Sequence, residues 1–225
     1  MAKNDFKKED QNLENVQESL TTAGMWIEQN RNMLEWIVLG IVLVVFGFVA
    51  LNNYVIKPKR LEASNENAKA VVYFQQGDFE KALHGDDAEC IGFEEIADKY
   101  GRYQQGKLAA LYAGICYAEL KDYENAAAYL KKFDADDLNV APAAAQRLGD
   151  VYVELDELDK AAACFEKAAK SGNEIIAPMS LKKAGLLYLE QGKKAQAKKA
   201  FEAIKSNYPA AQEAQDIDRF IALAD

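Results

Sequence analysis

The side chains that could do chemistry are few and lie far apart in this 225-residue chain. There are three cysteines, Cys90, Cys116 and Cys164, and one histidine, His84. No two cysteines form a CxxC pair, and an odd number leaves one unpaired in any disulfide scheme. We expect Cys116 and Cys164 to be small packing residues and Cys90 to be the thiol most exposed to solvent. A single histidine cannot build a multi-histidine metal site, and we give His84 no role.

Nucleotide, metal and hydrolase motifs are also missing. The chain has no GxGxxG, GxxxxGK[ST] or HExxH sequence. The acidic stretches 134–137 and 154–159 lack the glycine and terminal glutamate of a calcium-binding loop, so we interpret them as solvated turns. The sequence therefore predicts a protein that is not an enzyme, with no cofactor, no metal and no small-molecule substrate.

What recurs is a packing pattern. Gly149 follows Gly114 by 35 residues, and Gly185 follows Gly149 by 36. Each glycine is followed by tyrosine after 3 positions, alanine after 12 and a large apolar residue after 16; these are Tyr117, Tyr152 and Tyr188, Ala126, Ala161 and Ala197, and Leu130, Phe165 and Phe201. Glycine inside a helix costs about 1 kcal/mol relative to alanine. We expect close approach of a second helix as compensation, so that Ala161 of the second helix presses against the first helix.

This register resembles the tetratricopeptide repeat (TPR), a helix–turn–helix unit of about 34 residues. The resemblance implies an all-α TPR superhelix, a helix–turn–helix solenoid, with one N-terminal transmembrane helix. The expected segments are a polar tail with a short amphipathic helix (1–32), a transmembrane anchor (33–56), a linker (57–66), a divergent first unit (67–104), three repeats (105–141, 142–177 and 178–209) and a capping helix (210–225).

Two of these segments depart from the repeat pattern. The first unit keeps Ala70, Tyr73 and Ala82 at the repeat offsets, and its register breaks around Gly85-Asp86-Asp87, where we expect a turn. After Pro209, one helical face carries Ile217, Phe220, Ile221 and Ala224. Open solenoids need a final helix with a polar outer side, so we interpret this face as the inner side of a cap.

The apolar run from Trp36 to Leu51 contains no charge, and with its flanks it is long enough to cross a bilayer. A buried core helix would show a polar face, and a signal peptide would start nearer the N-terminus, so we expect a retained anchor. Before it, Leu13, Val16, Leu20, Ala23 and Ile27 keep helical spacing. Four basic residues flank the anchor on each side, so charge alone leaves its orientation open.

Charge is distributed unevenly along the chain. Residues 61–177 carry 12 Lys or Arg and 23 Asp or Glu, whereas residues 178–205 carry 7 and 2. The basic segment contains Lys182, Lys183, Lys193, Lys194, Lys198 and Lys199. It is either a solvated helix face or a contact for acidic headgroups or an acidic partner. The acidic balance of the whole chain disfavours nucleic acid.

Binding of protein or peptide segments remains. In a TPR array the first helices of the repeats line a groove, and the resemblance assigns to it Leu108, Leu111, Tyr112, Ile115, Gln146, Arg147, Asp150, Met179, Lys182, Lys183 and Leu186. Leu111 and Ile115 stand where the family's carboxylate clamp has Lys and Asn, so that specificity is not expected. The groove suits an amphipathic helix or extended peptide. Alternatively, the chain's own terminal helix fills part of it.

The whole arrangement resembles the bacterial ancillary subunit of the Sec translocon. That resemblance implies a single-pass protein of the bacterial inner membrane, with its N-terminus in the cytoplasm and its TPR domain in the periplasm. The implied partners are Sec translocon subunits and periplasmic chaperones, to which emerging proteins are handed over. The alternative is a membrane-anchored assembly scaffold for another envelope complex, unrelated to Sec.

Overall fold

The computed structural model describes residues 24–86 and 90–225. The chain divides into two compact units, Met1–Pro58 and Lys59–Asp225, and each is described by itself. Most of the amphipathic helix expected from Leu13 to Ile27 lies outside the described residues. Of its apolar set only Ile27 is described, in a helical stretch over residues 24–29.

The first unit consists of helix α2 (Arg31–Leu51) followed by the π-helical stretch η1 (Asn52–Ile56). No residue of either element is buried, and large side chains such as Trp36, Phe46 and Phe48 are exposed. Among the described residues, the helical segment Arg31–Gln76 is the one that is long and apolar enough to cross a membrane, judged by length and composition. The predicted anchor, 33–56, lies within it.

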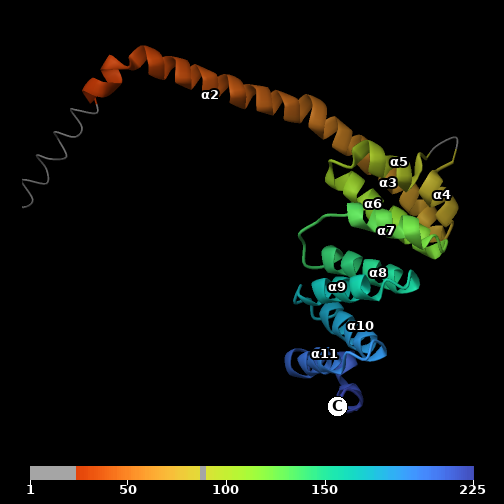
Figure 1. Ribbon diagram of the computed structural model, residues 1–225. Helices are drawn as coiled ribbons and strands as arrows, with labels where there is room; N and C mark the ends of the chain where they lie inside the picture. Colours follow the sequence, from red (N-terminus) through yellow and green to blue (C-terminus); the bar gives the residue numbers. More distant parts are fainter. Residues whose placement is uncertain (1–23, 87–89) are drawn as a thin grey trace, which may run out of the picture. The chain divides into compact units, whose positions relative to one another are not determined.

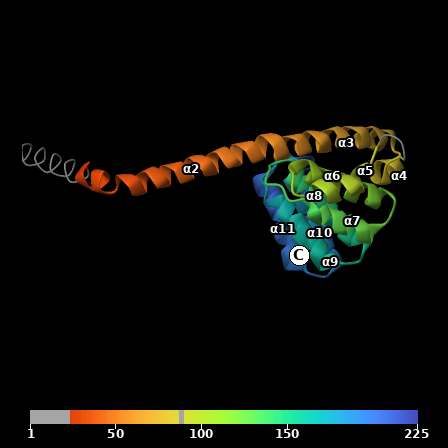
Figure 2. The same cartoon turned by 90° about the horizontal axis from the view of Figure 1, so that it is seen from above.

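The second unit is built from helices and turns, with one isolated β-bridge between Asp86 and Cys90 among its described residues. Its elements are α3 (Lys57–Gln76, which begins just before the unit), α4 (Phe79–His84), α5 (Gly92–Tyr100), α6 (Gln104–Glu119), α7 (Tyr123–Lys132), α8 (Val140–Glu154), α9 (Leu158–Ala169), α10 (Ile176–Glu190), α11 (Lys194–Asn207), the 3-10 turn η2 (Gln212–Ala214) and α12 (Ile217–Leu223). The pairs α6–α7, α8–α9 and α10–α11 stack in sequence order (Figures 1 and 2), which confirms the predicted all-α solenoid.

Each predicted repeat contains one helix pair. Helices α8 and α10 begin at Val140 and Ile176, two residues before the predicted starts at 142 and 178. Pro142 and Pro178 therefore lie in the first helical turn, where a proline is tolerated because that turn needs no backbone N–H donor.

The signature glycines meet the large residue 16 positions later. A Cβ added to Gly149 would lie 2.5 Å from Cε1 of Phe165, one added to Gly114 would lie 2.6 Å from Cγ of Leu130, and one added to Gly185 would collide with the ring of Phe201. The second helix therefore approaches the first closely at each of these glycines, as expected. Ala161 is fully buried, but the ring of Phe165 occupies the space that the glycine leaves.

The turn between the two helices of each unit needs one residue with a left-handed backbone. Gly77, Lys121, Asp156 and Gly192 have φ values of 77°, 65°, 57° and 69°, and each stands seven positions after the small residue of its unit. The next residue starts the second helix: the side chains of Asp78 and Asp122 accept hydrogen bonds from the N–H groups of Lys81 and Asn125. This is N-capping, typically worth about 1 kcal/mol per helix.

The first unit of the solenoid is interrupted where the sequence predicted it. Helix α4 ends at His84, and Gly85 follows with a φ of 86°. The hydroxyl of Tyr73 donates to the carboxylate of Asp86, which also accepts the N–H of Cys90. Helix α5 then resumes at Gly92 and buries Phe93 and other apolar residues.

Tyrosine hydroxyls connect successive units. Tyr117 of α6 and Tyr129 of α7 both donate to Glu94 of α5, at 2.8 and 2.9 Å. Tyr188 of α10 donates to Glu166 of α9 at 2.6 Å. Burial, reinforced by this carboxylate, raises the pKa of Tyr188 to about 12.

Helix α12 closes the C-terminal end, as predicted. Ile217 and Ala224 are buried, and Phe220 and Ile221 pack against the same core. The rings of Phe220 and Phe201 have their centroids 5.5 Å apart. Because Phe201 is the large residue of the last repeat, α12 covers the apolar face that a further repeat would otherwise cover.

Candidate functional site

The predicted groove residues lie on the first helices of three successive pairs. Helix α6 contacts α8, and α8 contacts α10, so the structure brings the three sets onto neighbouring elements (Figure 1). The sets are Leu108, Leu111, Tyr112 and Ile115 on α6, Gln146, Arg147 and Asp150 on α8, and Met179, Lys182, Lys183 and Leu186 on α10.

On α6, half of the predicted residues face inward. Leu111 is only 7% exposed and belongs to the core, so its assignment to the groove is corrected. The ring of Tyr112 stacks on Phe93 of α5, with centroids 4.9 Å apart, and meets the edge of Phe74 of α3. The preceding unit therefore covers this part of α6. Leu108 is exposed and Ile115 is half-buried.

The polar groove residues of α8 and α10 bind one another across the repeat boundary. Lys183 donates to both carboxylate oxygens of Asp150, at 2.6 and 2.7 Å. Gln146 donates to the hydroxyl of Ser180, which is fully buried, at 3.1 Å. The groove charges therefore join repeats, and less of their hydrogen-bonding capacity is left for a ligand.

Arg147 has the same role one repeat earlier. Its guanidinium group pairs with Glu119 near the end of α6. Both residues, together with Asp150 and Glu154, line a cleft of about 250 Å³ between α6 and α8. Lys121 also lines this cleft, and Lys183 already pairs with Asp150, so positive groups of the chain itself face its carboxylates.

The C-terminal segment covers one predicted groove residue. Lys182 pairs with Asp216 at 2.7 Å, and its ammonium group lies over the ring of Phe220, 4.9 Å from the centroid. This supports the alternative that the chain's own terminal helix fills part of the groove, at Lys182. Met179 and Leu186 on the same helix stay exposed.

The basic segment of residues 178–205 is largely neutralised within the chain. Besides Lys182 and Lys183, Lys193 pairs with Asp159 at 2.7 Å and Lys198 pairs with Asp225 at 2.5 Å. Paired lysines leave little free charge, which favours the interpretation of this segment as a solvated, ion-paired face over that of a contact for acidic headgroups.

The thiols are unsuited to chemistry. Cys90 is 4% exposed, so the expectation that it is the exposed thiol is wrong: the bridge to Asp86 and the packing of α5 enclose it. Burial raises the pKa of all three thiols, that of Cys116 to about 12, and a thiol in this state is a poor nucleophile. Within residues 24–86 and 90–225, no group of three or more His, Cys, Asp or Glu side chains could hold a metal ion.

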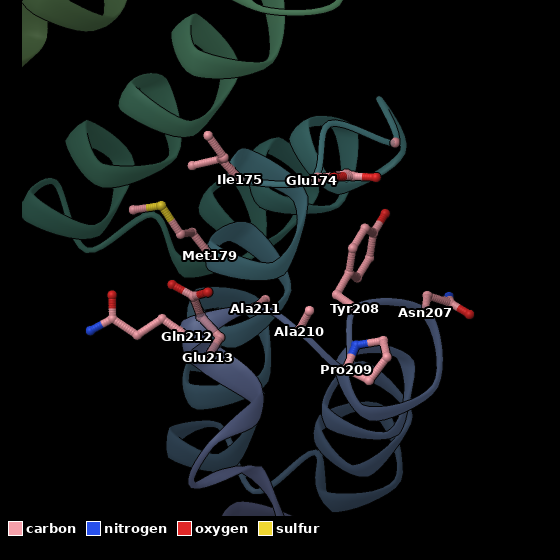
Figure 3. A pocket seen from close by; sticks show the side chains of 11 residues that line it. Glu174, Ile175, Met179, Asn207, Tyr208, Pro209, Ala210, Ala211, Gln212 and Glu213 are labelled. Atoms are coloured by element: carbon pink, nitrogen blue, oxygen red, sulfur yellow. The ribbon is translucent and has the colours of Figure 1, made fainter.

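A second surface was not anticipated from the sequence. A pocket of about 610 Å³ lies where the α9–α10 connection meets the segment after α11 (Figure 3). Its lining residues are Gly172, Glu174, Ile175, Met179, Asn207, Tyr208, Pro209, Ala210, Ala211, Gln212 and Glu213. Only Met179 belongs to the predicted groove. One feature of the sequence could have indicated the pocket. Ile175 is a large apolar residue in the connection between two helices, where polar residues are more usual.

Solved structures share this fold. Two crystal structures of MamA superpose with TM-scores of 0.52 and 0.55, at 19% and 20% identity; they match 69% and 72% of this chain and 91% and 84% of their own. A Podosopora anserina putative kinesin light chain structure with nearly identical TPR-like repeats has a TM-score of 0.53 at 13% identity, over 74% of this chain and 86% of its own. Identities this low establish the fold alone.

No curated protein sequence matches the chain. The family model described as tetratricopeptide repeat-like domain matches residues 25–220, nearly the whole length. The match agrees with the recurrent glycines, the stacked helix pairs and the closed C-terminal end. A TPR-like fold is typically a non-enzymatic scaffold for protein–protein interaction. The chain belongs to the tetratricopeptide repeat-like domain family.

Proposed function

We propose that the chain is a non-enzymatic, single-pass membrane protein whose TPR domain binds protein segments. The observation that carries the proposal is helix α2, which has no buried residue and exposes Trp36, Phe46 and Phe48. A helix this apolar in water would be strongly unfavourable unless lipid or another protein covered it. Trp36 and Tyr54 stand near the ends of the span, where interfacial aromatics are enriched.

For the location, we propose the bacterial inner membrane, with the N-terminus in the cytoplasm and the TPR domain in the periplasm, beside the Sec translocon. A polar tail, one anchor and a TPR domain in this order support it, by resemblance to the ancillary translocon subunit. In this role the TPR domain would pass emerging proteins to periplasmic chaperones. The cysteines are compatible with a periplasmic location, because the domain has no exposed pair of thiols that an oxidising compartment would join in a disulfide.

Topology mapping tests the anchor and its direction. Alkaline phosphatase fused after Asp225 should be active in intact cells, whereas green fluorescent protein at the same site should stay dark. The reverse result would end the periplasmic proposal. Replacing Leu43 and Val44 by arginine should release the protein from carbonate-washed membranes, since charge at the centre of a span is costly. Matched replacements at Leu120 and Val153, exposed residues of the TPR domain, should leave it in the membrane.

Site-specific crosslinking tests the partner. A photoreactive residue at Leu186 or Met179, both exposed on α10, should capture translocon subunits, exported chains or chaperones in living cells. The same residue at the buried position Leu111 is the control and should capture none of them. If the purified complex contains another envelope assembly and no translocon subunit, the proposed Sec association is wrong, and the alternative of a scaffold for that assembly replaces it.

A further inference from the structure

The unanticipated pocket is built from two connections between helices. Residues 172–179 form one part and residues 207–213 the other (Figure 3). The view places Ile175 and Met179 on one side, Tyr208 on the other, and Ala210 and Ala211 between them. A volume of about 610 Å³ is in the range of sites that enclose a ligand or an anchoring side chain.

Exposed apolar side chains stand both at the pocket and on the neighbouring connection. Ile175 is 72% exposed and Leu138, in the α7–α8 connection, is 71% exposed. Asn173 holds the two connections together: its amide nitrogen donates to the carbonyl oxygen of Leu138 at 3.0 Å, and its amide oxygen accepts the N–H groups of Ile175 and Ile176. The exposed side chains are therefore preorganised on a fixed backbone, which lowers the entropy cost of binding.

The pocket carries negative charge that the chain does not neutralise. Glu174 and Glu213 line it, and none of its eleven lining residues is lysine or arginine. Neither carboxylate takes part in an ion pair with any of the residues that the structure describes, in contrast to Asp150, Asp159 and Asp216. A pocket that combines apolar side chains with free carboxylates is complementary to an apolar side chain with cationic neighbours.

We propose that this pocket binds a protein segment that inserts an apolar side chain between Ile175 and Tyr208 and places lysine or arginine beside Glu174 and Glu213. This deepens the proposed protein-binding role and rests on it, but not on the Sec association or the orientation. Leu138 lies outside the pocket lining and is exposed, so an extended protein segment can contact both. A second copy of this chain has a net charge of −9, so charge does not favour it as the occupant.

Three labelled peptides and the full chain in detergent micelles provide the test. One peptide has two central leucines flanked by lysine pairs, the second has glutamate in place of lysine, and the third has serine in place of leucine. We expect the first to bind, with affinity falling as salt rises from about 0.1 M to about 1 M. The other two should bind about tenfold more weakly or worse, which corresponds to losing about 1.4 kcal/mol. Equal binding of the lysine and glutamate peptides would overturn the proposal.

Variants locate the bound peptide. Ile175→Ser should weaken binding about tenfold, and the pair Glu174→Gln and Glu213→Gln about threefold or more at low salt. Leu120→Ser and Glu124→Gln make the same kinds of change at exposed residues elsewhere and should leave affinity unchanged. As a control for folding, all variants should unfold at the same temperature as the unaltered protein.

Two outcomes separate this inference from the proposed function. Loss of binding in Leu186→Ser but not in Ile175→Ser places the peptide in the groove of the first helices, which overturns the pocket assignment and leaves the protein-binding role standing. If no peptide binds but crosslinks from Leu186 persist in cells, the pocket assignment is likewise overturned and the protein-binding role stands. Absence of both peptide binding and crosslinks overturns the protein-binding role itself.

Discussion

Lys183 of α10 lies within 2.7 Å of both carboxylate oxygens of Asp150 on α8, and this pair joins the first helices of two successive repeats. Arg147 and Glu119 make the same kind of connection between α8 and α6. The resemblance to TPR proteins assigns Arg147, Asp150 and Lys183 to ligand binding. In the structure the same residues connect successive repeats, on the surface where a ligand would lie. Binding at this surface must either leave the pairs intact or exchange them for contacts of similar strength.

A double-mutant cycle on Asp150→Asn and Lys183→Gln should give a coupling free energy of about 0.2–1 kcal/mol, because both side chains are about one-third exposed. Urea unfolding of the four variants measures it, and about 1 M salt should reduce it. Asp98 and Lys132, a more exposed pair at 2.9 Å between α5 and α7, provide the comparison and should couple less. A coupling near zero would mean that the pair does not link the repeats energetically.

Gly149→Ala should destabilise the fold by about 1–3 kcal/mol, because the new methyl group meets the ring of Phe165. Adding Phe165→Leu should recover part of that loss. In Gly114→Ala, the added Leu130→Ala should recover less of the lost stability. The new methyl group would still lie 2.9 Å from the backbone nitrogen of Leu130, which a side-chain substitution does not remove. Thermal unfolding of the single and double variants tests this, and equal rescue at both sites would contradict the geometry.

Substitutions at the left-handed turn position should have opposite signs in different repeats. Lys121→Gly relieves a backbone conformation that costs an L-residue about 1–2 kcal/mol, so it should be neutral or stabilising once the extra entropy of glycine is counted. Gly192→Ala should destabilise by about 1 kcal/mol, since nothing lies within 4 Å of its added methyl group and strain is its main cost. Chemical denaturation measures both, and a loss of stability in Lys121→Gly would count against this assignment.

Tyr188 should make stability depend on pH in the alkaline range. Its pKa is raised from 10.0 to about 12, so the folded state favours the neutral hydroxyl. The resulting stability is fully present below pH 10 and is lost as pH rises through about 12. Tyr188→Phe should be less stable near neutral pH, because the bond to Glu166 is gone, and should lose less stability between about pH 9 and pH 11. Urea unfolding at both pH values checks this, and parallel losses in the two proteins would contradict it.

The helix pairs could be predicted from the sequence because each small residue of a first helix is followed, 16 positions later, by the large apolar residue that packs against it. Gly149 and Phe165 form a complementary couple, and repetition of the couple at Gly114 and Gly185 defines the stack. Spacing indicates which residues share an interface, but it does not show that the ring of Phe165 fills the space beside Gly149. The interruption of the repeat after α4, at Gly85, was predicted from local turn residues alone.

The candidate site was less accessible to sequence reasoning. Leu111 and Tyr112 occupy groove positions by count, but the packing of the preceding unit encloses them, and that packing depends on contacts between distant residues. Cys90 looked exposed beside a turn and is buried for the same reason. Ile175 reads as a core residue, but the structure leaves it 72% exposed, across the pocket from Tyr208.

Helix α12 also removes a surface through which copies of the chain could associate. Every repeat presents an apolar face on which the next one can grow, and an unfinished face would accept the start of another molecule. Ile217 and Phe220 occupy that face, while Asp218 and Arg219 stand on the outer side in water. With this face covered, the C-terminal end does not offer it to another molecule.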